Sequence, residues 1–140
     1  MRKLARKARI LALEICYQLD IKDNFSDRKV HEILKEKSAD MDIISRASRI
    51  VKGVISNLSY IDSLIKKHSI NWDISRMSYV DRNILRIGIY EMIFEPEVPD
   101  VVAINEAIEI AKTYSSHDSG KFINGVLDSV RKAIANNKEK

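Results

Sequence analysis

The stretch Tyr79–Phe94, with the sequence YVDRNILRIGIYEMIF, decides the architecture of this chain. Its apolar side chains cover most of the circumference of a helix instead of one face: Val80, Ile84, Leu85, Ile87, Ile89, Met92 and Ile93. A helix that is apolar all round is usually buried. Pro96 and Pro99 follow it and stop it from continuing. We therefore predict a central helix over residues 79–94, with other helices packed around it.

The segments on either side also follow the helical period. Apolar residues recur at helical spacing over residues 3–20, 27–37, 42–57, 60–67, 101–114 and 121–135. Ser26, Ser59 and Ser78 stand where helix N-caps are expected. The chain has only four glycines and two prolines, and no useful stretch alternates as a strand does. We predict a single all-α domain of about seven helices, with an N-terminal half (1–70) and a C-terminal half (71–140) separated by the linker that carries Trp72.

The composition excludes several classes of protein. Of the 140 residues, 45% are hydrophobic and 31% are charged, which suits a soluble domain with a core. Cys16 is the only cysteine, so an internal disulfide is impossible. No apolar run is long enough to cross a bilayer. Glu14 and Gln18 interrupt the sequence after the basic N-terminus, so we expect no secretory signal and a cytoplasmic protein.

The positive charge of the chain is concentrated at its N-terminus. The chain has 24 Lys and Arg against 20 Asp and Glu, a net charge of +4. Five of the basic residues precede the first acidic residue, Glu14: Arg2, Lys3, Arg6, Lys7 and Arg9. Helical spacing predicts that Arg2, Arg6 and Arg9 project together, opposite the apolar stripe, with Tyr17 in the same sector. Such a segment indicates a docking surface for a polyanion; the alternatives are a solvated face and, for Tyr17, a core position.

A second candidate binding feature is the run from Asp118 to Phe122. Gly120 precedes the predicted last helix, whose free N–H groups could bind an anion, and Lys121 at the start of that helix adds positive charge. Phe122 could stack on an unpaired base. The alternative is that Asp118 or Ser119 only caps the helix and that Phe122 belongs to the core.

A third feature consists of the charges that interrupt the central helix: Asp81, Arg82, Arg86 and Glu91. Charged residues on a largely apolar helix can mark a protein interface. They can equally be structural, because Asp81 could complete a capping box with Ser78 and the arginines could pair with nearby acids.

Nothing in the sequence supports catalysis or a metal site. His31, His68 and His117 are far apart and none stands in a ligand pattern. Ser116, His117 and Asp118 are adjacent, whereas a catalytic triad needs side chains that converge from different elements. We therefore expect no catalytic residues, no metal and no cofactor.

Four blocks of the sequence resemble a known family. Residues 6–9 (RKAR), 84–91 (ILRIGIYE), 103–112 (AINEAIEIAK) and 121–128 (KFINGVLD) are similar, in this order, to bacterial transcription antitermination factors of the NusB family. The resemblance implies two small packed helical bundles. It also implies binding of the boxA segment of ribosomal RNA leader transcripts together with NusE, a small-subunit ribosomal protein, in a complex that helps RNA polymerase read through terminators.

The resemblance also implies roles for particular residues. RNA contacts carry over to Arg6, Lys7 and Arg9, less firmly to Arg2 and Lys3, and to Asp118, Lys121 and Phe122. NusE contacts carry over to Asp81, Arg82 and Arg86. Relatives can pair as homodimers, and the same module occurs fused to ribosomal RNA methyltransferases. The alternatives are therefore a protein–protein adapter that does not bind RNA, or an isolated relative of the methyltransferase module.

Overall fold

A computed structural model describes residues 2–37, 40–70 and 72–138, with side chains over 3–37, 40–70 and 72–136. Over these ranges the chain forms seven α-helices, one short 3-10 helix and no strand, which confirms the predicted all-α fold. The helices are α1 (Arg2–Ile21), α2 (Asp27–Lys35), α3 (Met41–Ser56), α4 (Leu58–His68), α5 (Tyr79–Phe94), α6 (Asp100–Tyr114) and α7 (His117–Lys138), and the 3-10 helix η1 spans Ile74–Arg76.

Helix α5 occupies the centre of the molecule. Every residue from Asn83 to Met92 is buried. The helix packs against α1, α3, α4, α6 and α7, so it touches nearly every other long element. Its all-round apolar surface is therefore matched by neighbours on all sides, as the sequence predicts.

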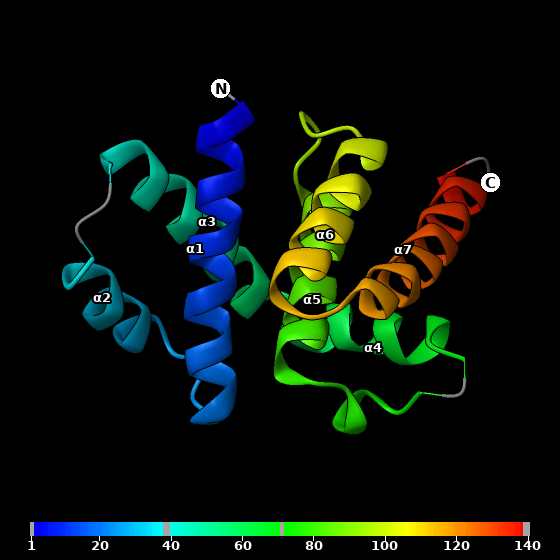
Figure 1. Cartoon of the computed structure of the whole chain (residues 1–140), viewed down its shortest axis with the longest axis horizontal. Coiled ribbons are helices and arrows are strands. Elements are labelled where there is room, and N and C mark those ends of the chain that lie inside the picture. The colour runs from blue at the N-terminus through cyan, green and yellow to red at the C-terminus, as the bar shows by residue number, and fades with distance from the viewer. Residues whose placement is uncertain (1, 38–39, 71, 139–140) are drawn as a thin grey trace.

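The helices form two groups around α5 (Figure 1). Helices α1, α2 and α3 pack together on one side, and α6 and α7 pack together on the other. Helix α4 lies against α5 and α7, so in packing terms it joins the C-terminal group although it precedes residue 70. The expected division at residue 70 stays a prediction.

The predicted helix starts are correct at two places and wrong at two. The hydroxyls of Ser26 and Ser78 accept hydrogen bonds from the N–H groups of Lys29 (3.2 Å) and Asp81 (3.0 Å). Ser59 is not a cap, because α4 already begins at Leu58. Helix α7 begins at His117, four residues before the expected start. These starts matter because the beginnings of α5 and α7 carry candidate site residues.

Within the described residues, no helix is long and apolar enough to span a membrane.

Candidate functional site

The basic residues of α1 divide into an exposed set and a paired set. Lys3 and Lys7 are exposed. The Arg6 side chain is 44% exposed, while that of Arg9 is only 9% exposed. The side chain of Arg2 lies outside the described residues. The expectation that Arg6 and Arg9 project together into solvent is therefore wrong for Arg9.

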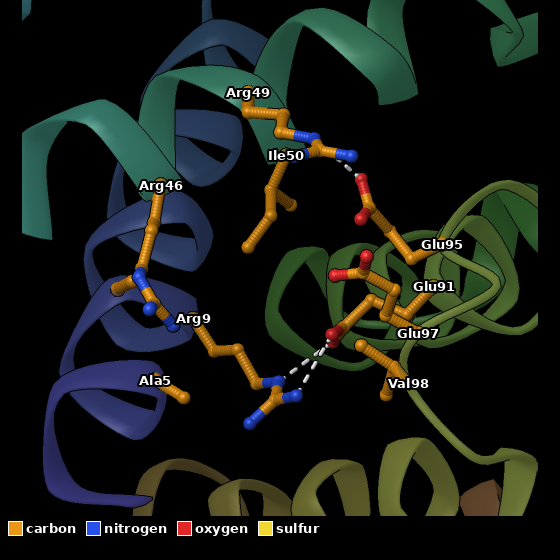
Figure 2. Close-up of a pocket in the computed structure, with 10 residues that line it drawn as sticks. Ala5, Arg9, Arg46, Arg49, Ile50, Glu91, Glu95, Glu97 and Val98 are labelled. Carbon is orange, nitrogen blue, oxygen red and sulfur yellow. Dashed lines mark hydrogen bonds and ion pairs between the residues drawn. The ribbon is translucent and has the colours of Figure 1, made fainter. Parts of the chain in front are cut away.

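Arg9 is held in a buried ion pair that joins α1 to α5 and α6. Its Nε and Nη2 donate to the two carboxylate oxygens of Glu91 at 2.7 and 2.9 Å, and its Nη1 lies 3.3 Å from Oε1 of Glu106. Figure 2 shows the Arg9 guanidinium reaching across the space between the helices to Glu91. Burial alone would lower the pKa of Arg9, but the hydrogen bonds and charges of the two glutamates raise it above its usual value. Arg9 is charged, paired and unavailable as a free phosphate ligand.

Arg6 shares Glu106 with Arg9. Its Nε donates to Glu106 Oε1 at 3.0 Å and its Nη2 to Oε2 at 2.5 Å. The hydrogen bond to Glu106, together with its charge, raises the pKa of Arg6. Because nearly half of the Arg6 side chain stays exposed, this arginine can face a ligand while Glu106 fixes its orientation.

The inward turn of Arg9 follows from how α1 packs. The helix contacts both α3 and α5, so its buried arc is wider than one stripe. Arg9 precedes buried Leu13 by four residues and therefore lies on the same side of the helix. The sequence shows the run of basic residues. It does not show that α1 has a second packing face, and this second face is where Arg9 is buried.

A groove opens where α1 faces α3 and the loop between α5 and α6. Two adjoining cavities of about 290 and 540 Å³ share Ala5, Arg9, Arg46, Glu97 and Val98 in their walls. Figure 2 shows Arg46 and Arg49 extending from α3 on one side and the glutamates on the other. Arg49 lies 2.8 Å from Glu95, whereas Arg46 makes no ion pair within the described part of the chain. The two signs of charge are mixed, so this groove does not favour a polyanion.

The start of α7 forms a second basic corner. Ser116 caps the helix, since its Oγ accepts from the Ser119 N–H at 3.0 Å. The alternative of a cap at Asp118 or Ser119 is therefore wrong. The predicted anion site is wrong as well, because the amides after position 120 lie inside the helix and not at its free end. Lys121 is exposed, as is Asp118. Lys112 of α6 passes beside Gly120 and adds a cation that the sequence analysis missed.

Phe122 sits at the edge of the core instead of fully inside it. It is half-buried, and its ring meets the Trp72 ring edge-on with centroids 5.9 Å apart. Trp72 itself is 55% exposed. In the sequence Trp72 only marks the linker, and its place at the surface against Phe122 is set by the fold. Tryptophan with part of its ring exposed is frequent at binding surfaces.

Asp81 ties the start of α5 to the start of α7. Its Oδ2 accepts from the Ser119 hydroxyl at 3.0 Å, while its backbone N–H donates to Ser78. Its carboxylate therefore does not complete the capping box, and Asp81 is half-buried between two helix starts. Its second oxygen, Oδ1, is buried without a hydrogen-bond partner in the structure.

Arg82 and Arg86 belong to a network centred on Asp20 of α1. Arg82 binds Asp20 through two hydrogen bonds of 2.6 Å. Arg86 binds Asp62 at 2.8 and 2.9 Å and Asp20 at 3.0 Å, and Asn83 donates to Asp20 at 2.8 Å. Burial would raise the pKa of Asp20, but the hydrogen bond from Arg82, the charge of Arg86 and the bond from Asn83 lower it. The network joins the two helix groups.

This burial corrects two of the four residues expected to face a partner. Arg86 is 5% exposed and Glu91 is 4% exposed, so neither offers its side chain to a docking protein. Their charges are satisfied internally by Asp20, Asp62 and Arg9. Asp81 and Arg82 remain partly accessible. The two arginines do pair with acids, but these acids are Asp20 and Asp62, which are distant from them in the sequence.

Tyr17 is a surface residue. It is 37% exposed and meets Tyr79, which is 42% exposed, edge-on at 6.1 Å. The Arg82 guanidinium lies over the Tyr79 ring, 4.6 Å from its centroid. Tyr17, Tyr79 and Arg82 thus form an aromatic patch that extends from the end of α1 to the start of α5, and the core alternative for Tyr17 is excluded.

The two basic regions lie apart along α6. Arg6 contacts Glu106, whereas Lys121 follows the end of α6 at Tyr114. Eight residues of helix correspond to about 12 Å along its axis. The N-terminal cations and Lys121 are therefore two separate exposed regions and not one continuous strip.

The described side chains contain no group of three or more His, Cys, Asp or Glu placed to hold a metal ion. The features that could act chemically are the exposed cations, the aromatic rings beside them and the polar atoms at the starts of α5 and α7. Among the described residues, these groups offer positive charge, hydrogen bonds and ring surfaces to a ligand.

Comparisons with known proteins place these features in context. A model of the NusB family matches residues 6–132. The chain is 45% identical over 135 residues to the transcription antitermination protein NusB of Fervidobacterium nodosum, covering 94% of this chain and 95% of that protein. It is 46% identical over 129 residues to the protein of the same name from Bdellovibrio bacteriovorus, covering 91% of this chain and 95% of the relative.

Solved structures agree. T. maritima NusB superposes with a TM-score of 0.81 at 39% identity, covering 91% of this chain and 90% of that one. A crystal structure of antitermination factors NusB and NusE in complex with dsRNA matches with a TM-score of 0.83 at 30% identity, covering 95% of this chain and 99% of that one.

Proposed function

The chain belongs to the NusB family, and on that premise we propose that it is a non-enzymatic, cytoplasmic transcription antitermination factor. It binds boxA-like single-stranded RNA of ribosomal RNA leader transcripts together with NusE, and the complex promotes read-through by RNA polymerase. The observation that carries this proposal is the close structural match over 95% of the chain to NusB in a complex with NusE and dsRNA.

The exposed cations supply the phosphate contacts in this proposal. They are Lys3, Lys7 and the outer edge of Arg6 on α1, with Lys112 and Lys121 at the other end of α6. Lysine and arginine bind phosphate oxygens without reading sequence. Arg9 is a positioning residue here, because its bond to Glu91 fixes α1 against α5.

The aromatic residues supply contacts to bases. Sequence-selective binding of single-stranded RNA depends on unpaired bases that stack on aromatic rings and form hydrogen bonds at their edges. Phe122 beside Asp118, and Tyr17 at the end of α1, present rings at or near the surface. An RNA strand held at both basic ends would pass these rings.

We assign the NusE contact to the start of α5. Arg82 keeps a partly accessible side chain there, Tyr79 adds an exposed ring, and Asp81 borders this surface on the side of α7. Arg86 and Glu91 lie beneath this surface and support it. Arg86 holds α5 against α4 through Asp62 and against α1 through Asp20. Glu91 holds α5 against α1 through Arg9.

The proposal is tested by measuring the affinity for a boxA-like single strand at several salt concentrations. The logarithm of the binding constant should fall linearly with the logarithm of salt, with about 0.7 of slope per phosphate contact. Lys7→Ala and Lys121→Ala should each reduce the slope by about that amount. Lys52→Ala, at an exposed position on α3, is the matched control and should leave the slope unchanged.

A capture experiment with purified NusE separates the alternatives. We expect NusE to bind the chain, and to bind it more tightly when RNA is present. Capture of NusE by a chain that binds no RNA would instead identify a protein–protein adapter. Failure to bind either one would contradict the proposed function altogether.

A further inference from the structure

Trp72 is the only tryptophan in the chain and lies on the surface between α4 and η1. It forms one wall of a cavity of about 240 Å³ enclosed by η1 and the starts of α5 and α7. The other walls include Arg76, Met77, Asp81, Ser119 and Phe122. No role follows for Trp72 from the packing of the fold, because more than half of its side chain is in contact with solvent.

The two rings of this cavity are held differently. Phe122 is half-buried against the core and fixed by α7. Trp72 comes from the linker and contacts Phe122 edge-on, with 62° between the ring planes and 5.9 Å between centroids. In this arrangement the Trp72 face is not stacked on Phe122. The exposed face of Trp72 is therefore free to stack on a planar ring of a ligand in the cavity.

A carboxylate also stands in the wall of the cavity. Asp81 lines it, and its Oδ2 accepts a hydrogen bond from the Ser119 hydroxyl at 3.0 Å. A carboxylate accepts hydrogen bonds through both oxygens, so a ligand with an N–H or amino edge suits this wall better than a purely apolar side chain of a partner protein.

One cation lines the cavity. Arg76 is a wall residue and is exposed, whereas Lys121 is not a wall residue but precedes Phe122 along α7. A ligand that combines a planar ring, an N–H edge and neighbouring negative charges would use every one of these groups. A nucleotide within an RNA strand has that chemistry, since each base presents an N–H or amino group on its pairing edge and a phosphate on either side.

We propose that this cavity seats one unpaired nucleobase of the RNA strand, with the base stacked on Trp72 and its pairing edge directed at Asp81. The inference rests on the proposed function, because it names a subsite on the same RNA path. It adds Trp72 and Arg76 to the RNA-contacting residues.

The test uses the fluorescence of Trp72 itself and the full chain. Addition of a boxA-like single strand should quench the emission, because a stacked base quenches indole. Trp72→Ala should weaken RNA binding by about 5- to 100-fold, measured by anisotropy of labelled RNA. The salt slope should not change, because no phosphate contact is lost. Trp72→Phe should recover most of the affinity.

Tyr60→Ala is the matched control, since Tyr60 is a 50% exposed aromatic residue on α4 outside the cavity. The subsite is wrong if Trp72→Ala binds RNA as tightly as Tyr60→Ala, or if saturating RNA leaves the emission unchanged. The proposed function would survive that result, because the slope changes of Lys7→Ala and Lys121→Ala report on it separately. Loss of NusE capture by Trp72→Ala, with RNA affinity intact, would assign the cavity to the protein partner and overturn the inference.

Discussion

Lys7 and Arg9 are two residues apart on the same helix and have opposite environments. Lys7 is exposed, while the Arg9 guanidinium is enclosed by Glu91 and Glu106. Two residues along a helix correspond to a rotation of about 200°, so neighbours in one charge run can face solvent and core. Whether a basic residue of α1 is exposed or buried therefore depends on its angular position on the helix, and not on its place in the basic run.

At the residue scale we predict that Arg9→Ala lowers the free energy of unfolding by about 3–5 kcal/mol. The substitution leaves Glu91 buried at 4% exposure without its main partner. Urea denaturation followed by circular dichroism measures the change.

The control for this prediction is Lys132→Ala. Lys132 pairs with Asp128 across one turn of α7, where the side chains are 68% and 36% exposed. Because both side chains are in contact with water, we expect Lys132→Ala to leave the free energy of unfolding nearly unchanged. An Arg9→Ala variant as stable as wild type, but with a reduced salt slope for RNA, would show instead that Arg9 is a phosphate ligand.

At the element scale, α5 was predictable and the start of α7 was not. The bounds of α5 agree with the prediction because Ser78 caps one end and Pro96 follows the other. Helix α7 includes Gly120, which reads as a helix breaker in the sequence. Ser116, which caps the helix, and the packing of α6 on α7 extend the helix through that glycine.

The close approach of α3 to α5 could not be predicted from the sequence either. A Cβ built on Gly53 of α3 would overlap the ring of Tyr90 on α5. Gly53 therefore permits two helices to approach at the centre of the molecule. Nothing in its neighbours along the chain distinguishes it from Gly125 of α7, whose Cβ would meet no atom within 4 Å.

We predict opposite effects for the two corresponding substitutions. Gly53→Ala should destabilise the protein by about 1–3 kcal/mol, because Tyr90 must move. Gly125→Ala should stabilise it by about 0.5–1 kcal/mol, because alanine favours the helix and meets open space. Thermal unfolding of the two variants measures both. An equal shift in the same direction would mean that the α3–α5 contact does not constrain stability.

At the scale of the whole molecule, the candidate site was predictable in its chemistry and only partly in its geometry. The basic N-terminus, Lys121 and Phe122 are visible as local patterns. The bonds that bury Arg9 and Arg86 join residues 82 and 66 positions apart, to Glu91 and Asp20, and no local pattern reveals them. Trp72 can be recognised as a candidate binding residue only in the folded structure, where its ring lies against Phe122.

The long-range ion pairs also explain how one surface can extend over two helix groups. Arg9 with Glu91, and Arg82 and Arg86 with Asp20, fix α1 against α5 near both ends. The exposed residues of α1 are thereby held at a constant position relative to α6 and α7. A strand of RNA bound at Lys7 and Lys121 would meet a rigid surface and lose little affinity to rearrangement.

The central claim is that RNA binds along the surface from the N-terminus of α1 to the corner formed by Trp72, Lys121 and Phe122. Amide chemical shifts of the isotope-labelled chain, recorded with and without a boxA-like single strand, test it most directly. The account predicts changes around residues 3–7, 72–76 and 117–122, and none in α2. Changes centred on α2 and the outer side of α3, with both basic ends unaffected, would contradict it.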